Sequence, residues 1–254
     1  MEKVRKILIV FFAVIMVVSG AMSIMRYMEL TSEQNSFEKV QEEMTMEPVA
    51  STEASAEVPT TQSEETLPVE TEPAYEPPEA LAKLMGEYPD CIGWIKIDDT
   101  KVDYPIMQNE DNEYYLHRDM DGNDSNSGCI YLDSNHDINE KGLHVIYGHH
   151  MKNGTMFKDV YRYVDESYME KHQNITITTD KQELKLRPVY RYTDVADGTY
   201  RMQLKTHGQV IEFIKNHTGQ EINTDNLFVL VTCEYTHQNG RLYLYCIPVE
   251  EDTE

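Results

Sequence analysis

Basic residues are scarce in this sequence, and the common metal-binding motifs are missing from it. Its 254 residues contain 22 Lys and Arg against 45 Asp and Glu, which gives a formal net charge of −23 at pH 7. Because binding to nucleic-acid phosphates needs a basic surface, this composition excludes nucleic acid as a partner. The sequence contains no Cys-x-x-Cys and no His-Glu-x-x-His motif, so we predict no zinc or other metal site.

Cysteine is also rare, with four residues in the whole chain: Cys91, Cys129, Cys233 and Cys246. Four cysteines permit at most two disulfides. If Cys233 is a nucleophile it must stay free, which leaves three cysteines and at most one bridge. Because Cys129 and Cys246 both fall in strand-like runs, we expect buried free thiols.

Long apolar runs are absent apart from one at the N-terminus. Lys3, Arg5 and Lys6 precede an apolar run of 19 residues, Ile7–Met25. As a helix this run measures about 28 Å, enough to cross a hydrocarbon core of about 30 Å. The basic residues before it predict a cytoplasmic N-terminus and an extracellular remainder. We therefore read residues 1–28 as a single-pass membrane anchor; a signal peptide cleaved near Ala21 is the alternative.

The next 52 residues, 29–80, contain fourteen Glu and a single Lys. Pro, Thr and Ser recur in this segment, and large apolar residues are sparse. Such a segment cannot bury enough surface to offset the entropy lost on ordering. We expect a disordered acidic linker that carries a folded domain, residues 81–254, away from the membrane.

The folded domain is organised around the stretch Leu227–Tyr245. Leu227–Thr232 is almost wholly apolar and β-branched, which is typical of a strand buried on both faces. Cys233 ends this run, Asn239 and Gly240 indicate a turn, and Arg241 opens a second strand. If the two strands pair antiparallel, the thiol and the guanidinium lie at the same end of one hairpin.

A fixed cation beside a sulfur favours the thiolate, which is the nucleophilic form. At a separation of about 4 Å the attraction is roughly 4 kcal/mol with an effective dielectric constant near 20. The hairpin therefore indicates a nucleophilic Cys233 supported by Arg241. The alternative is a buried strand cysteine and a surface arginine, because cysteine is among the most often buried residues.

A second stretch, HVIYGHHMKNGTMF (144–157), places His149 just after a short predicted strand. This stretch and the TC…R run resemble sortases, and class B sortases in particular. The resemblance spans roughly residues 81–249, with four further blocks: GWIKID (93–98), VDYPIMQ (102–108), DNEYYLHRDMDGN (111–123) and SGCIYLD (127–133). His149 takes the position of the family's catalytic histidine, and His150 takes that of the following Asn. Neighbours on an extended chain point to opposite sides, so only one of the two should face Cys233.

The resemblance implies a membrane-anchored cysteine transpeptidase that needs no cofactor. Cys233 would attack a sorting motif near the end of a secreted protein, either NPxTN-like or LPxTG-like, and form a thioester. His149 would act as general acid and then base, and Arg241 would steady the oxyanion or the peptide. The backbone amide of Glu234 would help to hold the oxyanion. An amine of a cell-wall precursor would resolve the thioester.

Other functions remain open from the sequence. Water could resolve the acyl-enzyme, as in a thiol peptidase, or a pilin lysine could act as the amine, as in a pilin-polymerising sortase. The chain could also be an inactive surface-binding module on a stalk. The presence of Cys233, His149 and Arg241 together disfavours that module, because binding alone does not need all three.

The fold predicted for residues 81–254 is mainly β. About eight short strands with helical insertions suggest a small closed barrel, and the resemblance implies the eight-stranded sortase barrel. An N-terminal helix is expected over 77–88, and further helices near 155–162, 165–171 and 207–217. The resemblance places the last of these between the sixth and seventh strands.

Overall fold

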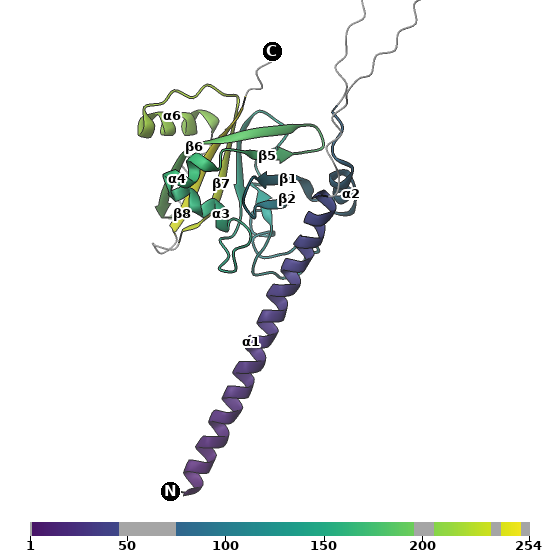
Figure 1. Cartoon of the computed structure of the whole chain (residues 1–254), viewed down its shortest axis with the longest axis vertical. Helices are drawn as coiled ribbons and strands as arrows, with labels where there is room; N and C mark the ends of the chain where they lie inside the picture. The colour runs from purple at the N-terminus through teal and green to yellow at the C-terminus, as the bar shows by residue number, and fades with distance from the viewer. Residues whose placement is uncertain (1, 46–74, 196–205, 235–239, 250–254) are drawn as a thin grey trace, which may run out of the picture.

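A computed structural model of the chain describes residues 2–45, 75–195, 206–234 and 240–249. Within these residues eight strands close into one barrel, in the order β1-β2-β3-β4-β7-β8-β6-β5 (Figure 1). The strands are β1 (Cys91–Ile97), β2 (Asp103–Met107), β3 (Ile130–Leu132), β4 (Gly142–Tyr147), β5 (Ile175–Thr178), β6 (Glu183–Val195), β7 (Asn226–Glu234) and β8 (Gly240–Pro248). The helices are α1 (Glu2–Thr45), α2 (Glu79–Glu87), α3 (Lys158–Tyr161), η1 (Arg162–Val164), α4 (Glu166–Lys171) and α6 (His207–Thr218). The predicted eight-stranded closed barrel with short helices is confirmed.

The barrel is mixed, with two parallel pairs among its strands. β2 runs parallel to β3 and β4 runs parallel to β7, while the other neighbours, including β1 and β5 at the closure, pair antiparallel. The predicted antiparallel pairing of β7 with β8 forms, and β5 pairs antiparallel with β6 in the same way. As a result, the ends of β4 and β7 point the same way and meet the start of β8.

β7 is buried on both faces, as its apolar run predicts. Phe228 and Leu230 belong to the main core inside the barrel, and the alternate residues Leu227, Val229 and Val231 belong to a second core outside it. This alternation follows from the two-residue period of a strand. The odd-numbered residues of β7 therefore face outward.

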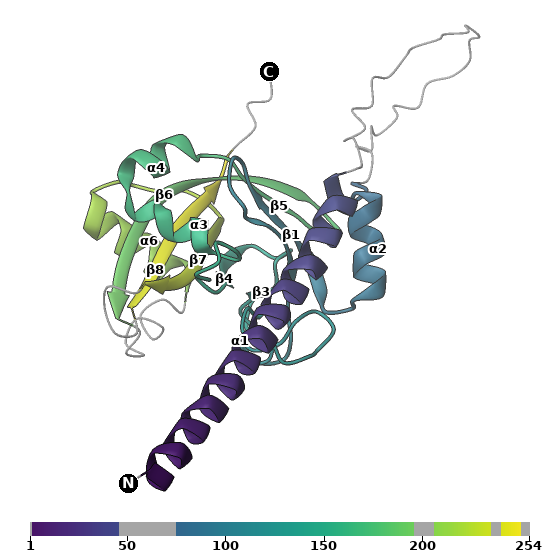
Figure 2. The same ribbon diagram turned by 60° about the horizontal axis from the view of Figure 1, so that its bottom comes forward.

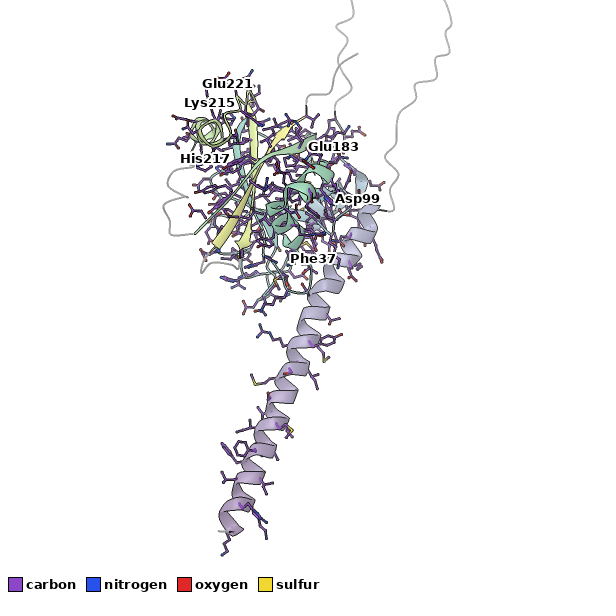
Figure 3. The ribbon with its side chains drawn as sticks, turned by 60° about the vertical axis from the view of Figure 1, so that its left-hand side comes forward. Phe37, Asp99, Glu183, Lys215, His217 and Glu221 are labelled. Atoms are coloured by element: carbon purple, nitrogen blue, oxygen red, sulfur yellow. The ribbon has the colours of Figure 1, made fainter. Side chains whose placement is uncertain are left out.

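The second core is covered by α6, which lies between β6 and β7 in the chain as predicted (Figure 1). Val210 and Ile214 of α6 are fully buried against β7 and β8. The Thr206 side chain caps the helix start by accepting from the Gln209 amide, and Gly219 ends it in a left-handed conformation with φ of 71°. Figure 3 shows the C-terminal end of α6 with Lys215 and Glu221. The Lys215 ammonium lies 2.6 Å from the Glu221 carboxylate.

The long helix α1 corrects the linker prediction. Residues 29–45, the first part of the predicted linker, continue α1 as helix, and α2 falls within the helix expected over 77–88. Extending an existing helix is easier than nucleating a new one, and this stretch has no proline before Pro48. The rest of the predicted linker, 46–74, lies outside the described residues.

The end of α1 packs on the barrel beside α2 (Figure 2). The Phe37 side chain, labelled in Figure 3, is 6% exposed. Its ring meets that of Tyr104 edge-to-face with 5.6 Å between centroids. The Gln41 amide donates to the Asp103 carbonyl of β2. Phe37, Val40 and Met44 recur at helical spacing, which is the signal of an amphipathic face that the sequence reading missed.

The first part of α1 is exposed instead of packed into the core. Its segment Phe11–Met28 is long and apolar enough to cross a membrane, and none of it is buried. In Figures 1 and 2 this part projects away from the barrel. A membrane anchor and a signal sequence both fit this finding.

Candidate active site

Cys233 and Arg241 lie opposite each other where β7 and β8 meet. In the antiparallel register of the two strands, Cys233 pairs with Arg241 and Glu234 with Gly240. Side chains directly opposite each other on an antiparallel pair lie on the same face. The thiol and the guanidinium therefore share one face, as the hairpin predicts. The Arg241 guanidinium also donates to the Gly240 carbonyl at 3.0 Å.

The parallel pairing of β4 with β7 brings His149 to the same place. Tyr147 pairs with Val231, and the Gly148 amide then donates to the Val231 carbonyl at 3.1 Å. His149 follows Tyr147 by two residues, just as Cys233 follows Val231 by two. Continuing the register puts His149 beside Cys233 on the outward-facing side of the sheet. The three residues predicted as a catalytic set are thus brought together by the ends of β4 and β7 and the start of β8.

Gly148 is required at the turn that leads into His149. A Cβ atom at this position would lie 2.4 Å from Ile130 Cδ1 and 2.6 Å from the Phe157 ring. Both of those side chains are fully buried and cannot easily move. The glycine lets β4 end close against the core, and the Thr232 hydroxyl fixes the turn by donating to the Gly148 carbonyl at 2.9 Å.

His149 is oriented by a backbone carbonyl that the sequence did not reveal. Its Nε2 lies 2.8 Å from the Leu116 carbonyl oxygen. A carbonyl oxygen only accepts, so Nε2 carries a proton, and Nδ1 is the nitrogen left to exchange one. Burial lowers the pKa of His149; the Leu116 carbonyl opposes this shift, and the nearby His117 and Arg241 charges add to it. The resting imidazole is therefore neutral, and it lies within the electrostatic reach of Arg241.

Leu116 lies in a loop whose backbone is held in place by hydrogen bonds to side chains of the same loop. The Asp111 carboxylate accepts from the amides of Glu113 and Tyr114, and the Ser125 hydroxyl accepts from the Gly128 amide. Gly128 takes a positive φ of 54°, and a Cβ there would come within 2.8 Å of the Leu116 carbonyl oxygen. The loop corresponds to the DNEYYLHRDMDGN block, whose role was not evident from sequence.

His150 does not share the environment of His149. Its Nδ1 lies 3.0 Å from the Cys233 carbonyl oxygen, and its Nε2 lies 2.6 Å from the Lys158 ammonium. The ring stacks on Tyr161 with 4.8 Å between centroids, and His150 is only 5% exposed. Both ring nitrogens of His150 are thus engaged, one by the backbone of the nucleophile's strand and the other by Lys158.

Cys129 and Cys246 are buried free thiols, as expected, and Cys91 is a third. Burial raises the pKa of the Cys91 thiol to about 11 and that of Cys129 well above its usual value. The Cys246 thiol is shifted the same way by its complete burial. A thiol held protonated is a poor nucleophile. Cys233, half-buried at a strand end, is the cysteine that a substrate can reach.

Comparison with known proteins agrees with this arrangement. Residues 95–249, more than half of the chain, match the model of the sortase domain. The chain belongs to the sortase family. Its curated relatives include sortase B of Listeria monocytogenes, 28% identical over 177 residues that cover 65% of this chain and 72% of the relative. Sortase B of Staphylococcus aureus is 24% identical over 245 residues, covering 92% and 91% of the two chains.

Solved structures show the same sortase fold. A Staphylococcus aureus sortase B–substrate complex superposes with a TM-score of 0.68 at 22% identity, covering 87% of this chain and 98% of that one. Bacillus anthracis sortase B, in complex with AAEK1, superposes with a TM-score of 0.66 at 22% identity, covering 89% and 100%. The relatives place this sortase in class B, and the family's activity is that of a cysteine transpeptidase that anchors surface proteins.

Proposed function

We propose that this sortase is anchored in the membrane by α1 and that Cys233, His149 and Arg241 carry its transpeptidation. The observation that supports this most is the strand register, which pairs Cys233 with Arg241 and, continued two residues past the Tyr147–Val231 pair, sets His149 next to Cys233. The substrate would be the sorting motif of a secreted protein, NPxTN-like or LPxTG-like, and the acceptor a cell-wall amine. No step in this chemistry requires a cofactor.

In the first half-reaction the Cys233 thiol gives its proton to His149 Nδ1 as the sulfur attacks the threonine carbonyl of the motif. The carbonyl carbon gains a bond to sulfur, and its oxygen takes the negative charge. Arg241 and the backbone amide of Glu234 stabilise that charge. The intermediate then expels the amine of the next residue, which takes the proton from imidazolium His149. A thioester and a free C-terminal peptide result.

In the second half-reaction an amine attacks the thioester. Neutral His149 accepts the amine's proton as the new amide bond forms, and the sulfur leaves as thiolate and takes that proton back from His149. The neutral resting state of His149 suits this cycle, because burial and the Arg241 charge both favour the imidazole. Leu116, which holds Nε2, keeps Nδ1 as the nitrogen that exchanges the proton in both halves.

The test is incubation of the full chain in detergent micelles with peptides carrying each motif, with and without an added amine. The amines would be a cross-bridge glycine peptide, a diaminopimelate peptide and an Nα-acetyl-lysine peptide. Mass spectrometry is expected to show a new amide product only when an amine is present, and Cys233→Ala should form none. Hydrolysis alone with every amine would indicate a thiol peptidase, and turnover by Cys233→Ala would exclude Cys233 as the nucleophile.

A further inference from the structure

The loop between β4 and α3, residues 148–157, carries His149 and closes back on itself; we call it the histidine loop. The Phe157 amide donates to the His149 carbonyl at 2.8 Å. His150 pairs with Met156 across the loop as an isolated antiparallel bridge. Because these contacts tie the two arms of the loop together, a shift of Met156 and Phe157 also displaces the backbone of His149.

Met156, on the second arm of the histidine loop, has a strained backbone. Its φ is 57°, in the left-handed region that residues with a Cβ atom rarely adopt, and its side chain is 1% exposed. Such a conformation persists where the surrounding structure holds it. The Tyr104 hydroxyl provides one such hold, because it accepts a hydrogen bond from the Met156 amide at 3.1 Å.

Tyr104 lies in the middle of β2, where the sheet fixes its position. It pairs with Ile95 of β1 and is 4% exposed. Without the Tyr104 hydroxyl, the buried Met156 amide would lose a hydrogen-bond partner, which is costly in a protein interior. The loop has room to shift in response, because Thr155 and Met156 line a cavity of about 300 Å³ together with Tyr104.

The docked end of α1 holds Tyr104 from the other side. The Phe37 ring packs edge-to-face on the Tyr104 ring, with 5.6 Å between centroids. The Gln41 side-chain amide bonds the Tyr104 hydroxyl and also donates to the Asp103 carbonyl. One hydroxyl group therefore connects α1 with the Met156 amide of the histidine loop.

We propose that Tyr104 positions the histidine loop for catalysis and that the docked end of α1 keeps the Tyr104 hydroxyl in place. This rests on the proposed function, in which His149 exchanges a proton with Cys233 and with the amines. Tyr104 is a positioning residue, because it acts on His149 through Met156. The barrel is then fully active only while α1 is docked, which couples the rate of the reaction to the helix that carries the apolar segment.

Two substitutions with matched controls test this role. Tyr104→Phe removes the hydroxyl and keeps the ring. Its control is Tyr163→Phe, in which another buried tyrosine loses a hydrogen bond to the backbone, from its hydroxyl to the His172 carbonyl at 2.8 Å. Gln41→Met removes the side-chain amide and keeps the length of the side chain. Its control is Glu42→Met, at the exposed neighbouring position.

The full chain in detergent micelles is assayed for transpeptidation with one peptide and one amine. We expect Tyr104→Phe to lower kcat about 10- to 100-fold, the scale of a small misplacement of a catalytic group. KM should stay nearly unchanged, because the substitution lies outside the residues that bind the peptide. Gln41→Met should show a smaller loss of kcat, and Tyr163→Phe and Glu42→Met should match the unsubstituted chain.

An unchanged kcat in Tyr104→Phe, or an equal loss in Tyr163→Phe, would overturn the role of Tyr104. An unchanged kcat in Gln41→Met would overturn the role of α1. Thermal melts show which variants fold. If Tyr104→Phe failed to fold, Gln41→Met and its control would still test the proposal, because Gln41 lies at the edge of the fold.

Nitrogen NMR of histidine-labelled chain tests the position of His149 without any reference to activity. The His149 signals, assigned by their absence in His149→Ala, should shift in Tyr104→Phe and Gln41→Met, because the contact of Nε2 with the Leu116 carbonyl changes when the loop moves. The signals of His144, near the start of β4, should stay in place.

A loss of kcat in Tyr104→Phe with unshifted His149 signals would contradict positioning. If the unsubstituted chain showed no transpeptidation, the proposed function would fail, while these spectra would still decide whether Tyr104 holds the histidine loop.

Discussion

At the scale of single residues, the site depends on two adjacent histidines that the backbone sends to different partners. His149 keeps Nδ1 open because Leu116 takes Nε2, whereas both nitrogens of His150 are engaged. The sequence alone predicts that one of them faces Cys233, through the alternation of an extended chain. It could not show which carbonyl holds His149, because Leu116 lies 33 residues away in a loop without a regular pattern.

His149→Ala should lower the rate of transpeptidation by about 10²- to 10⁴-fold, the usual cost of losing a general acid and base. The second-order rate constant for one peptide is compared with that of His150→Asn, which keeps a donor to the Cys233 carbonyl and should cost far less. Thermal melts confirm that both variants fold. If His150→Asn proved as inactive as His149→Ala, the assignment of roles to the two histidines would be wrong.

Arg241→Lys should be clearly impaired although the charge is kept. The guanidinium is a planar fork of several donors and can bond the Gly240 carbonyl and an oxyanion at once, whereas a compact ammonium on a flexible stem cannot reproduce that geometry. kcat and KM of the variant are measured with the same peptide. Activity equal to that of the unsubstituted chain would mean that only the charge at this position matters.

His144, inside the barrel, should make stability depend on pH. It is 2% exposed, its ring stacks on Phe228 with 4.5 Å between centroids, and burial lowers its pKa to about 4. In the unfolded chain this histidine takes up a proton near pH 6.5, whereas in the folded chain it does so only near pH 4. The contribution of neutral His144 to stability is therefore complete above pH 6.5 and is lost as the pH falls toward 4. The full difference is about 3 kcal/mol.

Melts of the full chain across this pH range are expected to show a shallower loss of stability for His144→Leu. Some slope should remain, because the pKa values of His136 and His149 are also lowered. His217→Asn, at an exposed position of α6, serves as the control and should keep the slope of the unsubstituted chain. An equal slope in His144→Leu would show that other groups carry the effect.

At the scale of elements, the strands were predictable because their pattern is local. The apolar run of β7 and the alternation in β8 give both strands and their hairpin from sequence. The end of α1 was missed because its composition, rich in Glu and poor in large apolar residues, is that of a linker. Its fold is decided by a few side chains at helical spacing and by a barrel surface far away in sequence, which composition does not record.

Phe37→Ala should weaken the contact between α1 and the barrel. Phe37 is nearly buried against Tyr104, and truncating a buried Phe usually costs about 3–5 kcal/mol, so a contact at the edge of the fold should cost less. Trp94 is the chain's single tryptophan, and its indole N–H donates to the Asp103 carboxylate at 2.7 Å, next to the contact between α1 and the barrel. Its fluorescence should therefore report the loss of that contact. Melts followed at Trp94 should shift down for Phe37→Ala and not for Lys39→Ala, an exposed neighbour. Equal melting curves would show that α1 does not dock in solution.

At the scale of the whole molecule, α1 links the catalytic barrel to an apolar segment that is long enough to cross a membrane. Its first part is apolar and exposed, and its last turns pack on β2 and α2. The continuous helix sets how far the barrel stands from the end of the apolar segment, at about 1.5 Å per residue. From Met28 to Phe37 this is about 14 Å, so the barrel would lie close to the membrane surface and not on a long tether.

Replacing residues 1–28 with a cleavable secretion signal should leave the enzyme active in vitro and abolish surface display in cells. The barrel and its active-site residues lie outside the replaced segment, so activity on soluble peptides should persist. In cells, enzyme and acceptor would no longer share the membrane surface, and the high effective concentration that a shared surface provides would be lost. The measurements are the peptide assay on enzyme recovered from the medium and the amount of a sorting-motif reporter bound to the wall. Normal display by the released enzyme would show that anchoring is not needed, and an inactive released enzyme would show that the first part of α1 supports the fold of the barrel.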